Sequence, residues 1–150
     1  MLYKELMAQR NDPKFCPFCD GANKVVKETP LAYLTYALAP YTKHHLLIVP
    51  KRHVEMLHDV TRNEMDDILD LQHFGMGVLQ LLGHHSVTAL VRQGESTGRS
   101  VQHVHYHLIP EIRIGDLDHE GNERRVMDEK DVDALMEELK RAVTTQETKL

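Results

Sequence analysis

The stretch V-Q-H-V-H-Y-H-L-I-P, residues 101–110, is the part of this sequence that decides both fold and chemistry. Three histidines, His103, His105 and His107, alternate in it with Val104, Tyr106 and Leu108. A period of two indicates a half-buried β-strand, on which the three imidazoles share one face while the opposite face packs. Each residue of a strand rises about 3.3 Å, so successive histidines are roughly 6.5–7 Å apart. One phosphate group can therefore meet two of them.

A single histidine is most often a surface or core residue with a hydrogen-bond partner. This interpretation is adopted for His44, His58, His73, His84, His85 and His119. Three histidines in strict alternation differ, because packing gives no reason to line one strand face with imidazoles. The pattern favours a phosphate site, a metal site or a proton-transfer site.

Composition limits the possible partners. The 150 residues suit one domain, residues 1–150, and 41% are hydrophobic, enough to fill a core. The formal charge of −5 argues against a nucleic acid polymer as partner, so a bound nucleotide must be held locally. No apolar run is long enough to span a membrane, and the N-terminus lacks the apolar core of a signal peptide. A cytoplasmic protein without membrane contact is expected.

The two cysteines, Cys16 and Cys19, stand together as C-P-F-C. In a reducing compartment this spacing points to metal or redox chemistry before a structural disulfide. Both thiolates can reach one zinc ion, because the turn between them brings them to adjacent tetrahedral positions. Two ligands are not four, so others must come from elsewhere in the chain. A dithiol that binds nothing is the alternative.

The remaining pattern predicts strands and helices in an α+β arrangement. Strands are expected over residues 24–28, 32–38, 45–49 and 86–91, besides the histidine strand. Residues 61–82 form the clearest helix, since Thr61 and Glu64 make a capping box and Gly83 suits the end. Its predicted core stripe is Met65, Ile68, Leu69, Gln72, Met76, Leu79 and Leu82. A second helix is expected over residues 130–143, and a helical turn or two without chemistry before residue 12.

A polar loop, residues 92–99, leads into the histidine strand. Its two glycines, with Ser96, Thr97 and Ser100, offer the backbone N–H groups and hydroxyls of an anion cradle. Surface loops often share this composition. The position directly before the histidines favours the functional interpretation.

The motif H-V-H-Y-H-L-I-P resembles the His-x-His-x-His-x-x signature of the histidine triad (HIT) superfamily of nucleotide hydrolases and transferases. Gly98, Ser100 and Val101 fit that family's lead-in, and P-K-R-H at 50–53 looks like its second landmark. The resemblance covers about residues 14–114. It implies an antiparallel sheet of about five strands with a long helix and a C-terminal helix, usually in a homodimer.

The resemblance also implies a mechanism acting on a small-molecule nucleotide. His105 would attack the α-phosphorus and form a nucleotidyl-histidine intermediate. His107 would donate to the phosphate oxygens, assisted by Ser100 and nearby backbone N–H groups, and His103 would orient the site. Gly98, Arg99 and Arg92 are the further expected substrate-binding residues.

In family members with a C-x-x-C, the position of His53 completes a metal site. The resemblance therefore implies a structural zinc ion held by Cys16, Cys19, His53 and His103. The third triad position separates the branches, because uridylyltransferases and dinucleoside polyphosphate phosphorylases typically carry glutamine where this chain has His107. That favours hydrolysis. A nucleotidyltransferase or phosphorylase, a non-catalytic nucleotide-binding module and a redox dithiol are the alternatives.

The sequence departs from the family pattern at three positions. Arg99 stands where hydrolases commonly have glutamine, and Arg92 where they often have asparagine. Each guanidinium can either bind a longer phosphate chain or face solvent. Ala37 falls where many members carry an acidic residue for the ribose hydroxyls, which leaves the nucleoside preference open.

Overall fold

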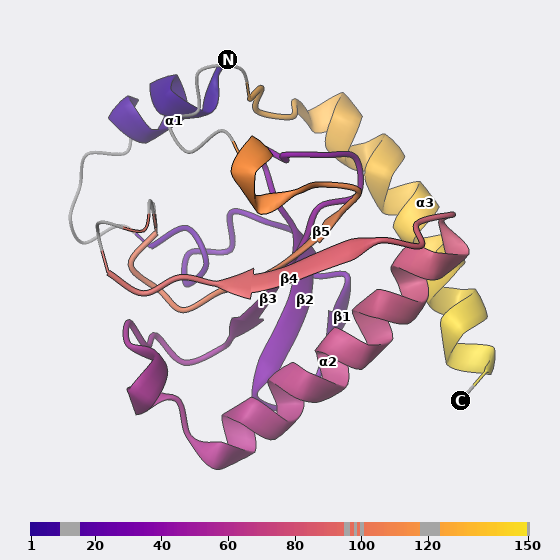
Figure 1. Cartoon of the computed structure of the whole chain (residues 1–150), viewed down its shortest axis with the longest axis horizontal. Helices are drawn as coiled ribbons and strands as arrows, with labels where there is room; N and C mark the ends of the chain where they lie inside the picture. The colour runs from indigo at the N-terminus through magenta and orange to yellow at the C-terminus, as the bar shows by residue number, and fades with distance from the viewer. Residues whose placement is uncertain (10–15, 95–96, 98, 100, 118–123, 150) are drawn as a thin grey trace.

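A computed structural model describes residues 1–9, 16–94, 97, 99, 101–117 and 124–149 (Figure 1). Five antiparallel strands form one sheet in the order β1-β2-β3-β5-β4. The strands are β1 (Lys27–Glu28), β2 (Ala32–Tyr36), β3 (Leu46–Pro50), β4 (Val87–Val91) and β5 (Tyr106–Pro110). The α-helices are α1 (Tyr3–Gln9), α2 (Arg62–Leu81) and α3 (Glu129–Thr148), with 3-10 turns at Leu57–Asp59 and Ile114–Asp116. The predicted α+β fold is confirmed.

Helices α2 and α3 lie side by side against one face of the sheet (Figure 1). The main core forms between them and the strands, and includes Leu34, Ile48 and Leu108 from the sheet and Leu139 from α3. A Cβ built on Gly75 of α2 would lie 2.8 Å from Leu108 Cδ1, so this glycine lets the helix approach β5 closely.

The opposite face of the sheet carries a smaller apolar cluster. Tyr33, Ala37, Leu47 and Val49 form it, with Phe18 packed against it. In the β3–β5 pair Leu47 is the register partner of His107. Because paired residues point to the same side of a sheet, His107 belongs to this second face, away from α2 and α3.

Helix α2 begins with the predicted capping box, in which the side chains of Thr61 and Glu64 bind each other's backbone N–H. Its predicted core stripe is wrong at one position, since Leu69 is 44% exposed. The helix instead buries Leu71, Phe74 and Val78. Residues 68 and 69 cannot both point to the middle of a face with 3.6 residues per turn, and the packing selects Ile68.

The histidine stretch is shorter as a strand than predicted, because β5 starts only at Tyr106. The backbone N–H of Val104 donates to Val54 O at 2.7 Å, in the segment after β3 and outside the sheet. His103 and His105 therefore precede the strand. The prediction that all three imidazoles share one strand face is wrong for His103, which faces the cysteines.

Helix α3 starts with a second capping box, between Asp128 and Asp131, and buries an apolar face that includes Leu135 and Leu139. It continues to Thr148, five residues beyond the predicted end at 143. An ion pair of 3.4 Å between Lys27 and Glu147 holds its last turns to β1. Within the part of the chain that the structure describes, no helix is both long and apolar enough to cross a membrane.

The N-terminal segment and the segment before α3 are joined to each other. Leu2 and Arg125 form an antiparallel bridge, and the backbone N–H of Val126 donates to Met1 O at 2.8 Å. The Met127 N–H donates to Leu38 O at 2.9 Å. Two segments far apart in sequence are thereby fixed beside the end of β2.

Candidate active site and metal cluster

His107 lies in β5 and its orientation is set by a second histidine. The backbone N–H of Tyr41 donates to His45 Nδ1 at 3.2 Å, so the proton of a neutral His45 ring sits on Nε2. His45 Nε2 lies 2.9 Å from His107 Nδ1 and donates to it. The remaining proton of His107 is then on Nε2. His107 therefore presents a donor to the pocket that it lines.

His105 is the opposite tautomer, with its proton on Nδ1. Its Nδ1 lies 2.7 Å from the carbonyl oxygen of His103 and must donate to it. A neutral ring then carries a lone pair on Nε2. The rings of His105 and His107 are 4.9 Å apart between centroids and line the same pocket. The pair offers a nucleophile and a hydrogen-bond donor to one bound group.

Burial keeps these rings neutral. It lowers the pKa of His105 to about 4 and that of His45 to about 3, and the nearby arginine charges add to both effects. The pKa of His107 is also lowered, by burial first and then by the charges of His105 and His45. A neutral imidazole is the form that can attack phosphorus.

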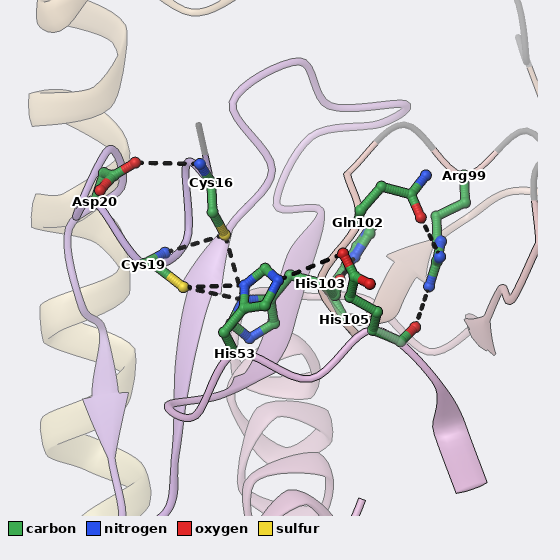
Figure 2. A network of polar contacts seen from close by, with 9 residues as sticks. Cys16, Cys19, Asp20, His53, Arg99, Gln102, His103 and His105 are labelled. Carbon is green, nitrogen blue, oxygen red and sulfur yellow. Dashed lines mark hydrogen bonds and ion pairs between the residues drawn. The ribbon is translucent and has the colours of Figure 1, made fainter. Parts of the chain in front are cut away.

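His103 faces the two cysteines, as Figure 2 shows. Its Nε2 donates to Pro50 O at 2.8 Å, which leaves the Nδ1 lone pair facing Cys16 Sγ at 3.3 Å and Cys19 Sγ at 3.5 Å. His53 Nδ1 lies 3.3 Å from Cys19 Sγ. The structure thus brings together the four residues that the sequence assigned to a metal.

The four donor atoms fit a tetrahedral ion. They all lie within 4.8 Å of one another. With Zn–S near 2.3 Å and Zn–N near 2.0–2.1 Å, sulfur and nitrogen ligands of one zinc ion are about 3.6 Å apart, close to the distances found here. Both thiols are free, and burial with the neighbouring Cys16 raises the pKa of Cys19 to about 11. A bound cation would reverse that shift, because thiolates are the ligating form.

Three arginines reach the pocket of His105 and His107. Arg92, Arg99 and Arg124 all line it. Arg99 is buried and donates to Glu55 O and to Gln102 Oε1. Arg99 therefore does not face open solvent, whereas Arg92 is partly buried, with its Nη2 atom buried. The rest of the wall is largely apolar and includes Ala37, Leu38 and Phe18.

The sequence missed three parts of the site. His45 was assigned only to a strand, Arg124 was not considered, and α1 was expected to have no chemistry although Tyr3, Leu6 and Met7 line the pocket. A signal was available, because His45 is two residues before Leu47 and therefore lies on the same face of the sheet. Leu47 pairs with His107, so His45 and His107 share that face. No local pattern marks Arg124. Two predicted substrate-binding residues, Gly98 and Ser100, lie outside the described residues.

Fold and site together define an α+β protein with a paired-histidine pocket next to a Cys₂His₂ cluster. The family model for the HIT domain matches residues 21–113. The chain belongs to the HIT domain family.

Several curated proteins share the domain. The NitFhit fusion protein of Caenorhabditis elegans is 35% identical over 107 residues, which cover 69% of this chain and 24% of that protein. The bifunctional bis(5'-adenosyl)-triphosphatase/adenylylsulfatase of Arabidopsis thaliana is 30% identical, with 78% and 65% covered. An adenosine 5'-monophosphoramidase of Schizosaccharomyces pombe is 33% identical, with 64% and 71% covered. The chain thus spans about a quarter and two thirds of the first two proteins.

Solved structures agree with the fold. A hypothetical histidine triad nucleotide-binding protein from Sulfolobus tokodaii superposes with a TM-score of 0.76 at 18% identity, covering 90% of this chain and 96% of the other. A Zn-bound histidine triad family protein from Mycobacterium smegmatis gives 0.70 at 20% identity, with 90% and 97% covered.

Proposed function

We propose that this protein is a nucleotide hydrolase that cleaves at the α-phosphate through a nucleotidyl intermediate on His105. The observation that carries the proposal is the Nδ1–H bond from His105 to the His103 carbonyl, because it leaves Nε2 unprotonated and facing the pocket. Relatives named as a triphosphatase and a phosphoramidase act on nucleotidyl compounds, which supports the same class of substrate here.

In the first step, His105 Nε2 forms a bond to the α-phosphorus and the bond from phosphorus to the leaving group breaks. The new imidazolium keeps its proton on Nδ1, which still donates to the His103 carbonyl oxygen. The positive charge therefore develops beside a hydrogen-bond acceptor. His107 Nε2–H donates a hydrogen bond to a phosphate oxygen as charge shifts onto the leaving group, and an amine leaving group takes up a proton from solvent as it departs.

In the second step, water forms a P–O bond and the P–N bond breaks. The imidazole departs neutral, with its remaining proton on Nδ1, and the proton lost by the water passes to solvent. Burial helps this step, because the low pKa of His105 marks a ring that is stable in the neutral form.

The test is intact-protein mass spectrometry after brief exposure to a mixture of dinucleoside polyphosphates and nucleoside phosphoramidates. We expect an adduct of one nucleoside monophosphate, located on His105 by fragmentation, and no adduct in His105→Asn. Melting curves must show that the variant is folded. Turnover without any adduct, or turnover retained in His105→Asn, would contradict the proposal.

A transferase differs only in the acceptor of the second step. Product analysis with and without added inorganic phosphate separates the two, since a hydrolase gives the nucleoside monophosphate in both cases. His107 in place of glutamine supports hydrolysis. Tight nucleotide binding without turnover across the panel would instead indicate a binding module.

We propose zinc as the resident metal of the Cys16, Cys19, His53 and His103 cluster. A closed set of four ligands leaves no open position for substrate, so the ion would be structural. It would join the N-terminal segment to His103, whose carbonyl holds His105. The ion would therefore support the nucleophile from a distance.

We also propose a homodimer and a cytoplasmic location. β4 is an edge strand of the sheet, and its apolar residues Val87, Leu90 and Val91 are only partly buried. An edge of this kind is a template for pairing with a second copy. Sedimentation at the mass of one chain would contradict the dimer, and fractionation of cells tests the location.

A further inference from the structure

Arg92, Arg99 and Arg124 stand out in a chain whose net charge is −5. All three line the pocket of His105 and His107, and among the described residues that form its wall there is no Asp or Glu. The local charge is therefore opposite to the charge of the whole protein. Such a concentration of positive charge at a largely buried site needs a compensating anion.

Each guanidinium also has a buried nitrogen without a hydrogen-bond partner among the described residues. The atoms are Arg92 Nη2, Arg99 Nε and Arg124 Nε. A buried donor without a partner is costly. All three belong to side chains that line one pocket, which favours a ligand with several acceptor oxygens there.

The three arginines line the same pocket as the reacting histidines, and their charges reach these rings. The charges of Arg99 and Arg92 act on His105, while those of Arg92 and Arg124 act on His107 and His45. An α-phosphate between His105 and His107 occupies only part of this field. The arginines therefore face groups attached to that phosphate as well.

Arg124 comes from outside the matched family segment, residues 21–113. Its guanidinium carbon lies 4.4 Å from the centre of the Tyr3 ring and 4.1 Å from that of Tyr41, so the group is held between two aromatic faces. It also donates to Ala39 O at 3.1 Å. The Leu2–Arg125 bridge fixes Tyr3 and Arg124 in the same unit. An arginine held in this way is pre-organised for an anion.

We infer that Arg92, Arg99 and Arg124 form one anion site next to the His105–His107 pair, which selects nucleotides whose leaving group carries at least two further negative charges. This inference rests on the proposed hydrolase function. It makes polyphosphate-linked nucleotides the preferred substrates over phosphoramidates, whose leaving group is an amine. Arg124, supplied by the terminal segments, is a specificity-determining residue.

The first test measures binding alone, by titration calorimetry with inorganic tripolyphosphate and with inorganic phosphate. We expect tripolyphosphate to bind at least about tenfold more tightly, with an affinity that falls steeply with salt. Arg124→Gln, Arg92→Asn and Arg99→Gln should each weaken tripolyphosphate binding by about tenfold or more. Arg141→Gln removes the same charge from the exposed face of α3 and should change it less than about twofold. Equal binding of the two anions, or no loss in any of the three variants, would overturn the inference.

The second test compares kcat/KM for diadenosine tetraphosphate and adenosine 5'-phosphoramidate. The three variants should lose at least about tenfold on the tetraphosphate and less than about threefold on the phosphoramidate. Equal losses on both would overturn the inference, because the arginines would then act on the shared α-phosphate. If neither compound is turned over and no His105 adduct forms, the hydrolase proposal fails, while tripolyphosphate binding still decides the anion site.

Folding and positioning need their own comparison. Melting curves identify any variant that is unfolded, and Arg99→Met replaces Arg99→Gln if burial of the glutamine amide unfolds the protein. At position 3, Tyr3→Phe keeps a ring beside Arg124 and Tyr3→Leu removes it. Tripolyphosphate binding should fall further in Tyr3→Leu than in Tyr3→Phe. Equal binding by the two would overturn the role of the aromatic stack.

Discussion

At the scale of single residues, the site depends on which ring nitrogen carries a proton. Three hydrogen bonds decide this: Tyr41 N–H to His45, His45 to His107, and His105 to the His103 carbonyl. Each fixes one tautomer, because the other ring nitrogen must then have the complementary role. A lone pair on His105 and a donor on His107 follow without any change in charge.

The buried His45 makes stability depend on pH in a defined direction. Its folded pKa of about 3 lies below the usual value near 6.5, so between these values the unfolded chain binds more protons than the folded one. Stability contributed by neutral His45 is complete above pH 6.5 and is lost as pH falls toward 3.

We therefore expect the free energy of unfolding of the wild type to decrease faster over this window than that of His45→Gln. The difference between the two slopes should be at most about 1.4 kcal/mol per pH unit. Urea denaturation at several pH values measures it. His58→Gln is the control, since His58 is exposed. Parallel curves for wild type and His45→Gln would contradict the assigned burial effect.

At the scale of elements, the contact of α2 with β5 supports the histidine pair from behind. Gly75 faces Leu108, the neighbour of His107. The second glycine of α2, Gly77, is also crowded, since an added Cβ would lie 2.2 Å from the side-chain amide of Gln146. The two neighbours differ, because the end of Gln146 can rotate away whereas Leu108 is fixed in the core.

Gly75 and Gly77 give two matched predictions. Gly75→Ala should destabilise the protein by about 1–3 kcal/mol through overpacking, while Gly77→Ala should be neutral or stabilise by up to about 1 kcal/mol through helix propensity. Urea titrations of both variants measure the difference. Equal stability of the two would show that α2 can shift on the sheet.

The same elements show what a sequence predicts well. Capping boxes and apolar periodicity are local, so the sequence predicted both long helices, although α3 continues five residues beyond the predicted end, and it predicted which cysteines and histidines form the cluster. The start of β5 was misplaced because the backbone of Val104 bonds to Val54, a partner 50 residues away. His45 and Arg124 were missed for the same reason: their roles depend on neighbours that only the folded chain brings near.

At the scale of the whole molecule, the Cys₂His₂ cluster joins the N-terminal segment, the loop after β3 and the approach to β5. If it binds zinc, removing the metal should loosen all three attachments. We expect one zinc per chain by metal analysis, and a melting temperature lowered by at least about 5 °C after chelation.

Activity should fall with the metal and return when zinc is added back. Cys19→Ser should lower the melting temperature in the same direction and make it insensitive to chelator. His73→Gln, which alters a histidine outside the cluster, should respond to chelator as the wild type does. Purified protein without zinc that melts at the same temperature after zinc addition would contradict a structural metal.

The bridge between Leu2 and Arg125 joins the two segments that hold Tyr3 and Arg124. These segments are separate in sequence from the histidines of the reaction site. The histidines lie within residues 21–113, the segment that the family model matches, whereas Tyr3 and Arg124 lie outside it. If Arg124 sets the substrate preference, exchanging these flanking segments should change that preference and leave the histidine chemistry intact. Grafting both flanks together onto another family member is the corresponding route to transplanting selectivity, since either alone would lack its companion.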